Sequence, residues 1–108
     1  MHTHDKIKDD ILSSEYITGR CEEEMLQEVE RIFGAMHKAH EIEVKHYQNT
    51  IQKLSETLNL AQKKPAKHKL KNAIEELRKE VMHFEEAHPA LVRSVEKIIA
   101  LFGGLGMA

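Results

Sequence analysis

One strong break in the middle of the chain, Lys63-Lys64-Pro65-Ala66, most limits what this sequence can fold into. Proline can begin a helix but cannot continue one, because it lacks the backbone N–H and its ring clashes with the preceding turn. On both sides of the break, apolar residues recur in steps of three and four, which predicts two long amphipathic helices. Upstream they are Met25, Val29, Ile32, Met36, Val44, Tyr47, Ile51, Leu54, Leu58 and Ala61, and downstream Leu70, Ile74, Leu77, Val81, Phe84, Leu91 or Val92, Val95, Ile98 or Ile99, and Phe102.

Folding the chain at this break pairs the two apolar stripes along their whole length. In that register Leu54 meets Ile74, and Val29 meets Ile99. At a rise of about 1.5 Å per residue, the arms 25–62 and 66–102 span about 57 and about 55 Å, so their lengths match. The sequence therefore predicts an all-α fold, a long antiparallel helical hairpin of coiled-coil type with its turn near 63–66.

Each stripe contains one irregular step of four-then-four residues, at His40 in the first arm and at His88 in the second. The two irregular steps lie opposite each other, so both helices are expected to unwind locally at one level. Pro89 also disfavours helical geometry at His88. We expect the second arm to be kinked at His88-Pro89, with a last helix that runs to about Phe102 and stops at Gly103. The main alternative is a three-helix bundle folded at this point.

Residues 1–24 form an N-terminal helical extension beyond the paired region, and residues 25–108 form the predicted hairpin domain. The apolar stripe continues into the extension through Ile7 and Ile11, but with polar residues between them. The extension either continues the first helix or forms a separate helix broken near Ser13-Ser14. As an overhang, it is expected to pack on a second subunit.

The small size of the chain favours self-association. A two-helix hairpin buries only one stripe per helix, so a chain of 108 residues built in this way has marginal stability. Two hairpins that pair would form a four-helix bundle. The predicted assembly is therefore a homodimer or another homo-oligomer.

Composition and charge narrow the classes of function. A formal net charge of −2 argues against nucleic-acid binding. The single Cys21 excludes an intrachain disulfide and fits a reducing compartment. Residues 1–10 lack the apolar core of a secretory signal, and no apolar run approaches the roughly 20 residues that span a bilayer. We therefore expect a cytoplasmic protein without a membrane span.

Three segments near the C-terminus resemble a family of small bacterial proteins. They read Leu70-Lys71-Asn72-Ala73-Ile74-Glu75-Glu76-Leu77, then Phe84-Glu85-Glu86-Ala87-His88-Pro89-Ala90-Leu91, and last Leu101-Phe102-Gly103-Gly104-Leu105-Gly106. Residues 70–107 are thus similar to the uncharacterised domain-of-unknown-function family 4404, whose members carry an F-E-x-x-H-P-x-L segment before a glycine-containing tail. The resemblance implies a short, all-helical, bacterial protein, and it implies no activity.

The common motifs of catalytic sites are absent from the sequence. It has no phosphate-binding loop, no nucleophile elbow, no dinucleotide-binding glycine motif and no C-x-x-C pair. His40-Glu41 opens like a zinc-protease motif, but the next histidine is His46, and the motif needs an i,i+4 pair to place both rings on one metal. Cys21 has no nearby basic cluster that would lower its pKa. We therefore expect that the chain is not an enzyme and has no cofactor.

Histidine and glutamate provide the only candidate metal ligands. Three Glu-x-x-His pairs have the spacing used in di-metal carboxylate bundles, and two further histidines lie three residues apart. The preferred interpretation is a polar layer that fixes helix register, because Glu43, His46, Glu80 and His83 flank the stripe. A divalent-metal-binding bundle is the alternative function, and a buried His40–His88 layer that makes the bundle pH-sensitive is a third interpretation. The metal candidates are His37, His40, Glu43, His46, Glu80, His83, Glu85 and His88.

The central turn is basic and is the candidate site for a partner. Lysines are unfavourable at the start of a helix, which is the positive end of its dipole, so their presence there can mark a site for an acidic protein. Acidic residues at 22–24 lie at the far end of the predicted hairpin, which gives the hairpin a lengthwise charge polarity. We therefore expect a structural or protein–protein interaction module that acts as a homo-oligomer. The candidate partner-binding residues are Lys63, Lys64, Lys67, Lys69 and Lys71.

Overall fold

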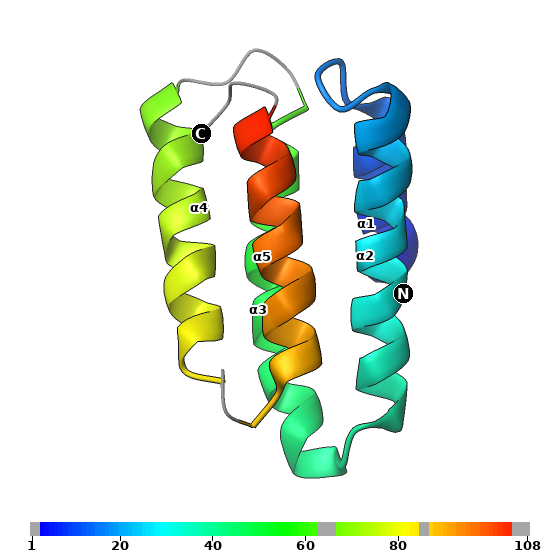
Figure 1. Cartoon of the computed structure of the whole chain (residues 1–108), viewed down its shortest axis with the longest axis vertical. Coiled ribbons are helices and arrows are strands. Elements are labelled where there is room, and N and C mark those ends of the chain that lie inside the picture. The colour runs from blue at the N-terminus through cyan, green and yellow to red at the C-terminus, as the bar shows by residue number, and fades with distance from the viewer. Residues whose placement is uncertain (1–2, 63–66, 85–86, 105–108) are drawn as a thin grey trace.

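A computed structural model describes residues 3–62, 67–84 and 87–104. These residues form five helices and no strand, which confirms the all-α prediction (Figure 1). The predicted turn at 63–66 lies outside the described residues. The helices are α1 (Thr3–Ser13), α2 (Gly19–Lys38), α3 (Glu41–Leu60), α4 (Lys67–Met82) and α5 (Pro89–Gly104).

Helices α2 to α5 form an up-and-down bundle, and α1 lies against it. The most extensive contacts join α2 to α5 and α3 to α4, with smaller interfaces between α4 and α5 and between α2 and α3. α1 packs on both α2 and α3. The junctions between α2 and α3 and between α4 and α5 lie at the same end of the bundle (the lower end of Figure 1).

The prediction of a long hairpin, kinked only in its second arm, is wrong. The described backbone measures 38 × 24 × 23 Å, whereas the predicted arms would be far longer. The first arm divides between Lys38 and Glu41, and the second between Met82 and Pro89. The arms still pair with each other, because α3 packs on α4 and α2 packs on α5. Both reversals fall at the irregular steps of the stripes, where the apolar seam loses its register, and Pro89 gives α5 a favourable first residue.

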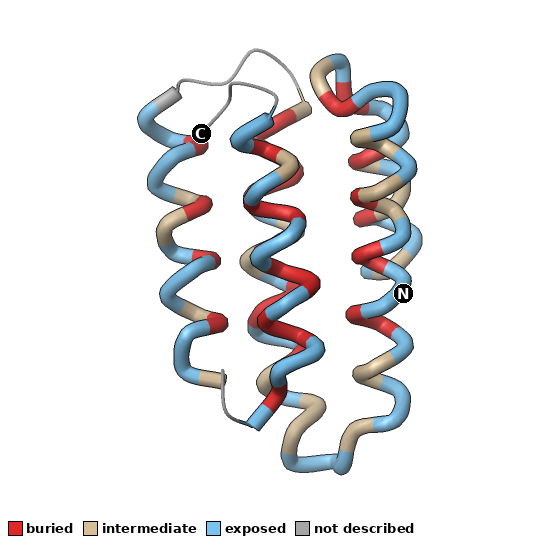
Figure 2. The backbone as a smooth tube through the Cα atoms, in the orientation of Figure 1, coloured by how far each residue is buried: buried red, intermediate tan, exposed pale blue. Residues whose placement is uncertain are grey.

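The folded-back arms enclose one hydrophobic core within a single chain. Leu54, Leu77 and Ile98 are fully buried, and Figure 2 shows the buried positions along the inner side of each helix. Ile7 and Ile11 of α1 are fully buried as well. A single chain therefore forms the four-helix bundle that was predicted for a dimer of hairpins. Self-association is not needed to bury the apolar stripes.

Several buried polar side chains have partners inside the bundle. Thr50 and Thr57 are buried, and their hydroxyls donate to the carbonyls of His46 (3.1 Å) and Lys53 (2.9 Å). Glu28 of α2 is 2% exposed and accepts from Arg31 at 2.5 Å, while Lys97 of α5 lies 3.4 Å away. A buried carboxylate is costly without such partners. The ion pair between Glu28 and Lys97 joins α2 to α5.

α1 is a separate helix that returns onto its own chain. The Ser14 hydroxyl donates to the carbonyl of Ala61 (3.0 Å) and accepts from the backbone N–H groups of Tyr16 and Ile17 (both 3.2 Å). This arrangement closes a tight turn after α1 and fastens it to the end of α3. The N-terminal extension was expected to pack on a second subunit. In the structure it packs on α2 and α3 of its own chain instead.

Candidate functional site

The two chain reversals gather histidines from separate parts of the sequence at one end of the bundle. His37 belongs to the last turn of α2, and His46 to the second turn of α3. His83 follows α4, and His88 precedes α5. We call this region, with His40 at the α2–α3 junction, the histidine end (Figure 1).

His88 lies at the centre of this end and is 6% exposed. Its Nδ1 atom is 3.6 Å from Oε2 of Glu43, and its ring meets the ring of Tyr47 edge-on at a centroid distance of 5.3 Å. The His46 ring lies 5.7 Å from that of His88 and stacks on Phe84 at 4.5 Å. Within the described part of the chain, the buried Nδ1 atom of His46 has no hydrogen-bond partner.

The predicted His40–His88 layer is wrong. His40 is exposed and lies where the chain turns from α2 into α3. Its backbone N–H donates to Oε1 of Glu43 at 3.1 Å, so Glu43 connects the start of α3 with His88. Because the first arm ends at this level instead of continuing, position 40 turns outward, and His88 faces Tyr47 and His46 in its place.

The other metal candidates are not brought together. Nδ1 of His37 is hydrogen-bonded to the carbonyl oxygen of Phe33 at 2.8 Å, and His83 is exposed. Glu80 is half-buried on α4, while Glu85 lies outside the described residues. Among residues 3–62, 67–84 and 87–104, no group of three or more His, Cys, Asp or Glu side chains has a geometry that could hold a metal ion.

The basic candidates that the structure describes lie at the other end of the bundle. Lys63 and Lys64 are outside the described residues, Lys67 opens α4, and Lys69 and Lys71 are exposed. The acidic residues 22–24 open α2, and α2 and α4 start at the same end (Figure 1). The predicted lengthwise charge polarity is therefore wrong, because folding the first arm back carries its acidic end to the basic one.

A groove between α1, α2 and α3 was not predicted. It is open and has a volume of about 540 Å³, and its apolar lining is the half-buried Met36 together with Phe33 and Ile51, which are 5% and 4% exposed. The sequence signal that could have revealed it is the position of Phe33 beside the stripe, which makes the apolar face of α2 wider than a hairpin needs. We call it the α2–α3 groove, and its lining residues are Thr3, Lys6, Phe33, Met36, Gln48, Ile51, Gln52, Ser55 and Glu56.

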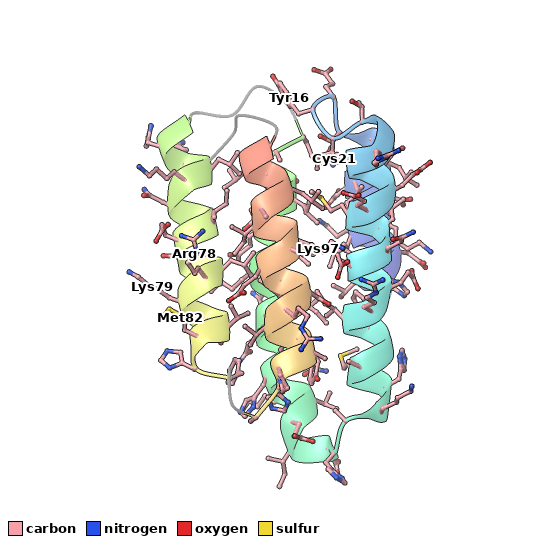
Figure 3. All side chains as sticks on the ribbon, viewed as in Figure 1. Tyr16, Cys21, Arg78, Lys79, Met82 and Lys97 are labelled. Carbon is pink, nitrogen blue, oxygen red and sulfur yellow. The ribbon has the colours of Figure 1, made fainter. Side chains whose placement is uncertain are left out.

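The single thiol has the properties of a structural cysteine. Cys21 is half-buried in α2, beside the core. Burial raises the pKa of its thiol, and the negative charge of Glu24 raises this pKa further. Both effects lower the fraction of reactive thiolate at neutral pH. Figure 3 shows Cys21 near the start of α2, far along the bundle from the histidine end.

The chain belongs to the DUF4404 family, whose description is "Domain of unknown function" and whose model matches residues 21–107. The match covers α2 to α5 and leaves all of α1 outside. It confirms the family suggested by the C-terminal segments and extends it to most of the chain. No curated protein and no solved structure matches. In the described part of the chain, no helix has both the length and the apolar character needed to cross a bilayer.

Proposed function

We propose that this member of the DUF4404 family is a protein-interaction module that binds a partner protein through the α2–α3 groove. The observation that carries the proposal is the groove itself, an open concavity of about 540 Å³ on the side of a bundle whose core is already filled. In this proposal the protein is not an enzyme and acts by binding a partner at its surface.

The residues of the groove suit contact with another protein. Met36 is half-buried and belongs to a side-chain type that is enriched in protein–protein interfaces. Gln48 and Gln52, both exposed, form a polar rim on α3. An apolar centre surrounded by a polar rim is the usual anatomy of an interface, because the rim keeps water from the centre.

The remaining binding predictions stand beside this proposal. A homo-oligomer is one form that it can take, with a second copy as the partner. An acidic partner at the exposed Lys69 and Lys71 is a separate surface at the basic end of the bundle. The place where a bound protein attaches distinguishes this basic surface from the groove, and the mass of the bound protein identifies a homo-oligomer.

Site-specific photo-crosslinking in cells tests the proposal. A photoreactive amino acid at Gln52, on the rim of the groove, is expected to give an adduct with a protein of defined mass. The matched control is Lys79, which is exposed on α4 and points away from the bundle (Figure 3). An adduct of twice the chain mass would identify a homo-oligomer.

The outcome is informative at both positions. An adduct from Gln52 without one from Lys79 supports binding at the groove. Adducts from Lys79 alone would assign binding to a different surface, and no adduct from either position in cells that express the protein would contradict the interaction module.

A further inference from the structure

We infer that the partner segment held in the α2–α3 groove is an amphipathic helix that carries two aliphatic side chains one turn apart. This inference rests on the proposed function and specifies the kind of partner that the groove fits. It is carried by α1, because α1 already occupies the neighbouring part of the same face.

α1 is an example of the segment that this face binds. It packs on both α2 and α3, and Ile7 and Ile11 are fully buried. The two isoleucines are four residues apart, so they lie one above the other on one side of the helix. Asp5 and Asp9 on the outer side are exposed. An amphipathic helix with an i,i+4 aliphatic pair therefore fits between α2 and α3.

α1 is too short to cover the whole face. It has 11 residues, whereas α3 has 20. These lengths correspond to about 16 and about 30 Å, so about 14 Å of α3 extends beyond α1. The groove lies beside the first turns of α1, because Thr3 and Lys6 line it together with α3 residues from Gln48 to Glu56. That stretch of α3 spans about 12 Å, or more than two helical turns, which is enough for a pair of side chains one turn apart.

The walls of the groove favour a helix over an extended strand. Both walls are helices, whose backbone N–H and C=O groups bond within the helix. A strand docked there would leave its own backbone groups without partners from the walls, whereas a helix satisfies its backbone internally and presents only side chains. The half-buried Met36, flanked by the edges of Phe33 and Ile51, offers an apolar contact that matches aliphatic side chains.

The continuity of the α1 interface with the groove supports the same conclusion. The family match begins at residue 21, after α1, and includes most of α2 and all of α3. The surface that receives α1 continues directly into the groove. Phe33 belongs to both, because its ring stacks on that of His4 of α1 at a centroid distance of 4.2 Å and it also lines the groove.

Extending α1 in the full chain tests whether the groove accepts a helix. Seven helix-forming residues replace Met1 and His2, with Thr3→Leu and a second leucine three residues before it. The matched variant has glutamine at both positions, which keeps helix propensity similar and removes the apolar contact. Because burial of a leucine is favourable, we expect the leucine variant to have a folding equilibrium constant at least about tenfold larger, measured by urea unfolding.

A second substitution places the effect in the groove. Met36→Glu introduced into both extended chains is expected to abolish most of the difference between them, because it puts a charge on the apolar floor. Met82→Glu is the control, since Met82 is exposed on α4, outside the groove (Figure 3). Equal stability of the leucine and glutamine variants would overturn the inference.

The natural partner gives an independent test. The peptide attached to Gln52 in the crosslinked adduct is expected to come from a helical segment with aliphatic residues three or four positions apart. Attachment through a strand or a proline-rich segment would overturn the helix inference and leave the interaction module intact. Absence of any adduct would instead contradict the proposed function, while the stability test would still report whether the groove receives a helix.

Discussion

His4 and Lys8 of α1 both reach Glu30 of α2, at 2.7 and 3.3 Å, so one carboxylate holds two side chains of α1. The hydrogen bond from His4 lowers the pKa of Glu30 below its ordinary value of 4.5, and Lys8 acts in the same direction. A carboxyl whose pKa is lowered by folding stabilises the fold above its unfolded pKa, and this contribution is lost as the pH falls through the folded value.

Glu30→Gln should therefore weaken α1 docking at neutral pH and make no difference in strong acid. The stability gap between the wild type and the variant should be present at about pH 7 and absent at about pH 2, because Glu30 is protonated at the lower pH. Urea unfolding at both pH values measures the gap, and Glu23→Gln on an exposed position of the same helix is the control. A gap of the same size at both pH values would contradict the role of the carboxylate.

At the scale of elements, two glycines of α2 have opposite roles. Gly19 begins the helix with φ +63°, a left-handed conformation that lets the chain turn from α1 into α2. Gly34 lies within the helix, and a Cβ added there would have no atom within 4 Å. Gly19→Ala should destabilise the fold by about 1–2 kcal/mol, and Gly34→Ala should stabilise it by about 0.5–1 kcal/mol, as measured by urea unfolding.

Each glycine is the control for the other, because the same substitution is made in the same helix. Equal effects of the two substitutions would mean that the turn before α2 adapts without a left-handed residue. A destabilising Gly34→Ala would mean that this exposed side of α2 is covered in solution.

At the scale of the whole molecule, one chain supplies all four helices of the bundle and α1 besides. An obligate dimer unfolds at a temperature that rises with protein concentration, because association is part of its stability. Here the core is closed within one chain. The midpoint of thermal unfolding is therefore expected to be the same at about 1 and about 100 μM protein, as followed by circular dichroism. A midpoint that rises with concentration would show that self-association contributes to folding, as first expected from the hairpin.

The amino-acid sequence by itself determined the helices, because helical period and helix termination are local properties. Apolar residues at steps of three and four predicted the inner sides of α2 to α5, and Pro89 marked the start of α5. The family was also readable from the segments around His88-Pro89. The histidines near both irregular steps indicated where polar side chains would collect, although not which of them would meet.

Only the tertiary structure decided how the two arms are arranged. The pairing of α3 with α4 and of α2 with α5 is compatible with a straight hairpin and with a folded one, because both bury the same seam. Folding back is favoured by apolar side chains beside that seam, such as Phe33 and Leu91, which a straight hairpin would leave in water. That choice depends on contacts between residues far apart in sequence, and it also decides that His88 meets Tyr47, that α1 lies on α2 and α3, and that a groove remains open beside it.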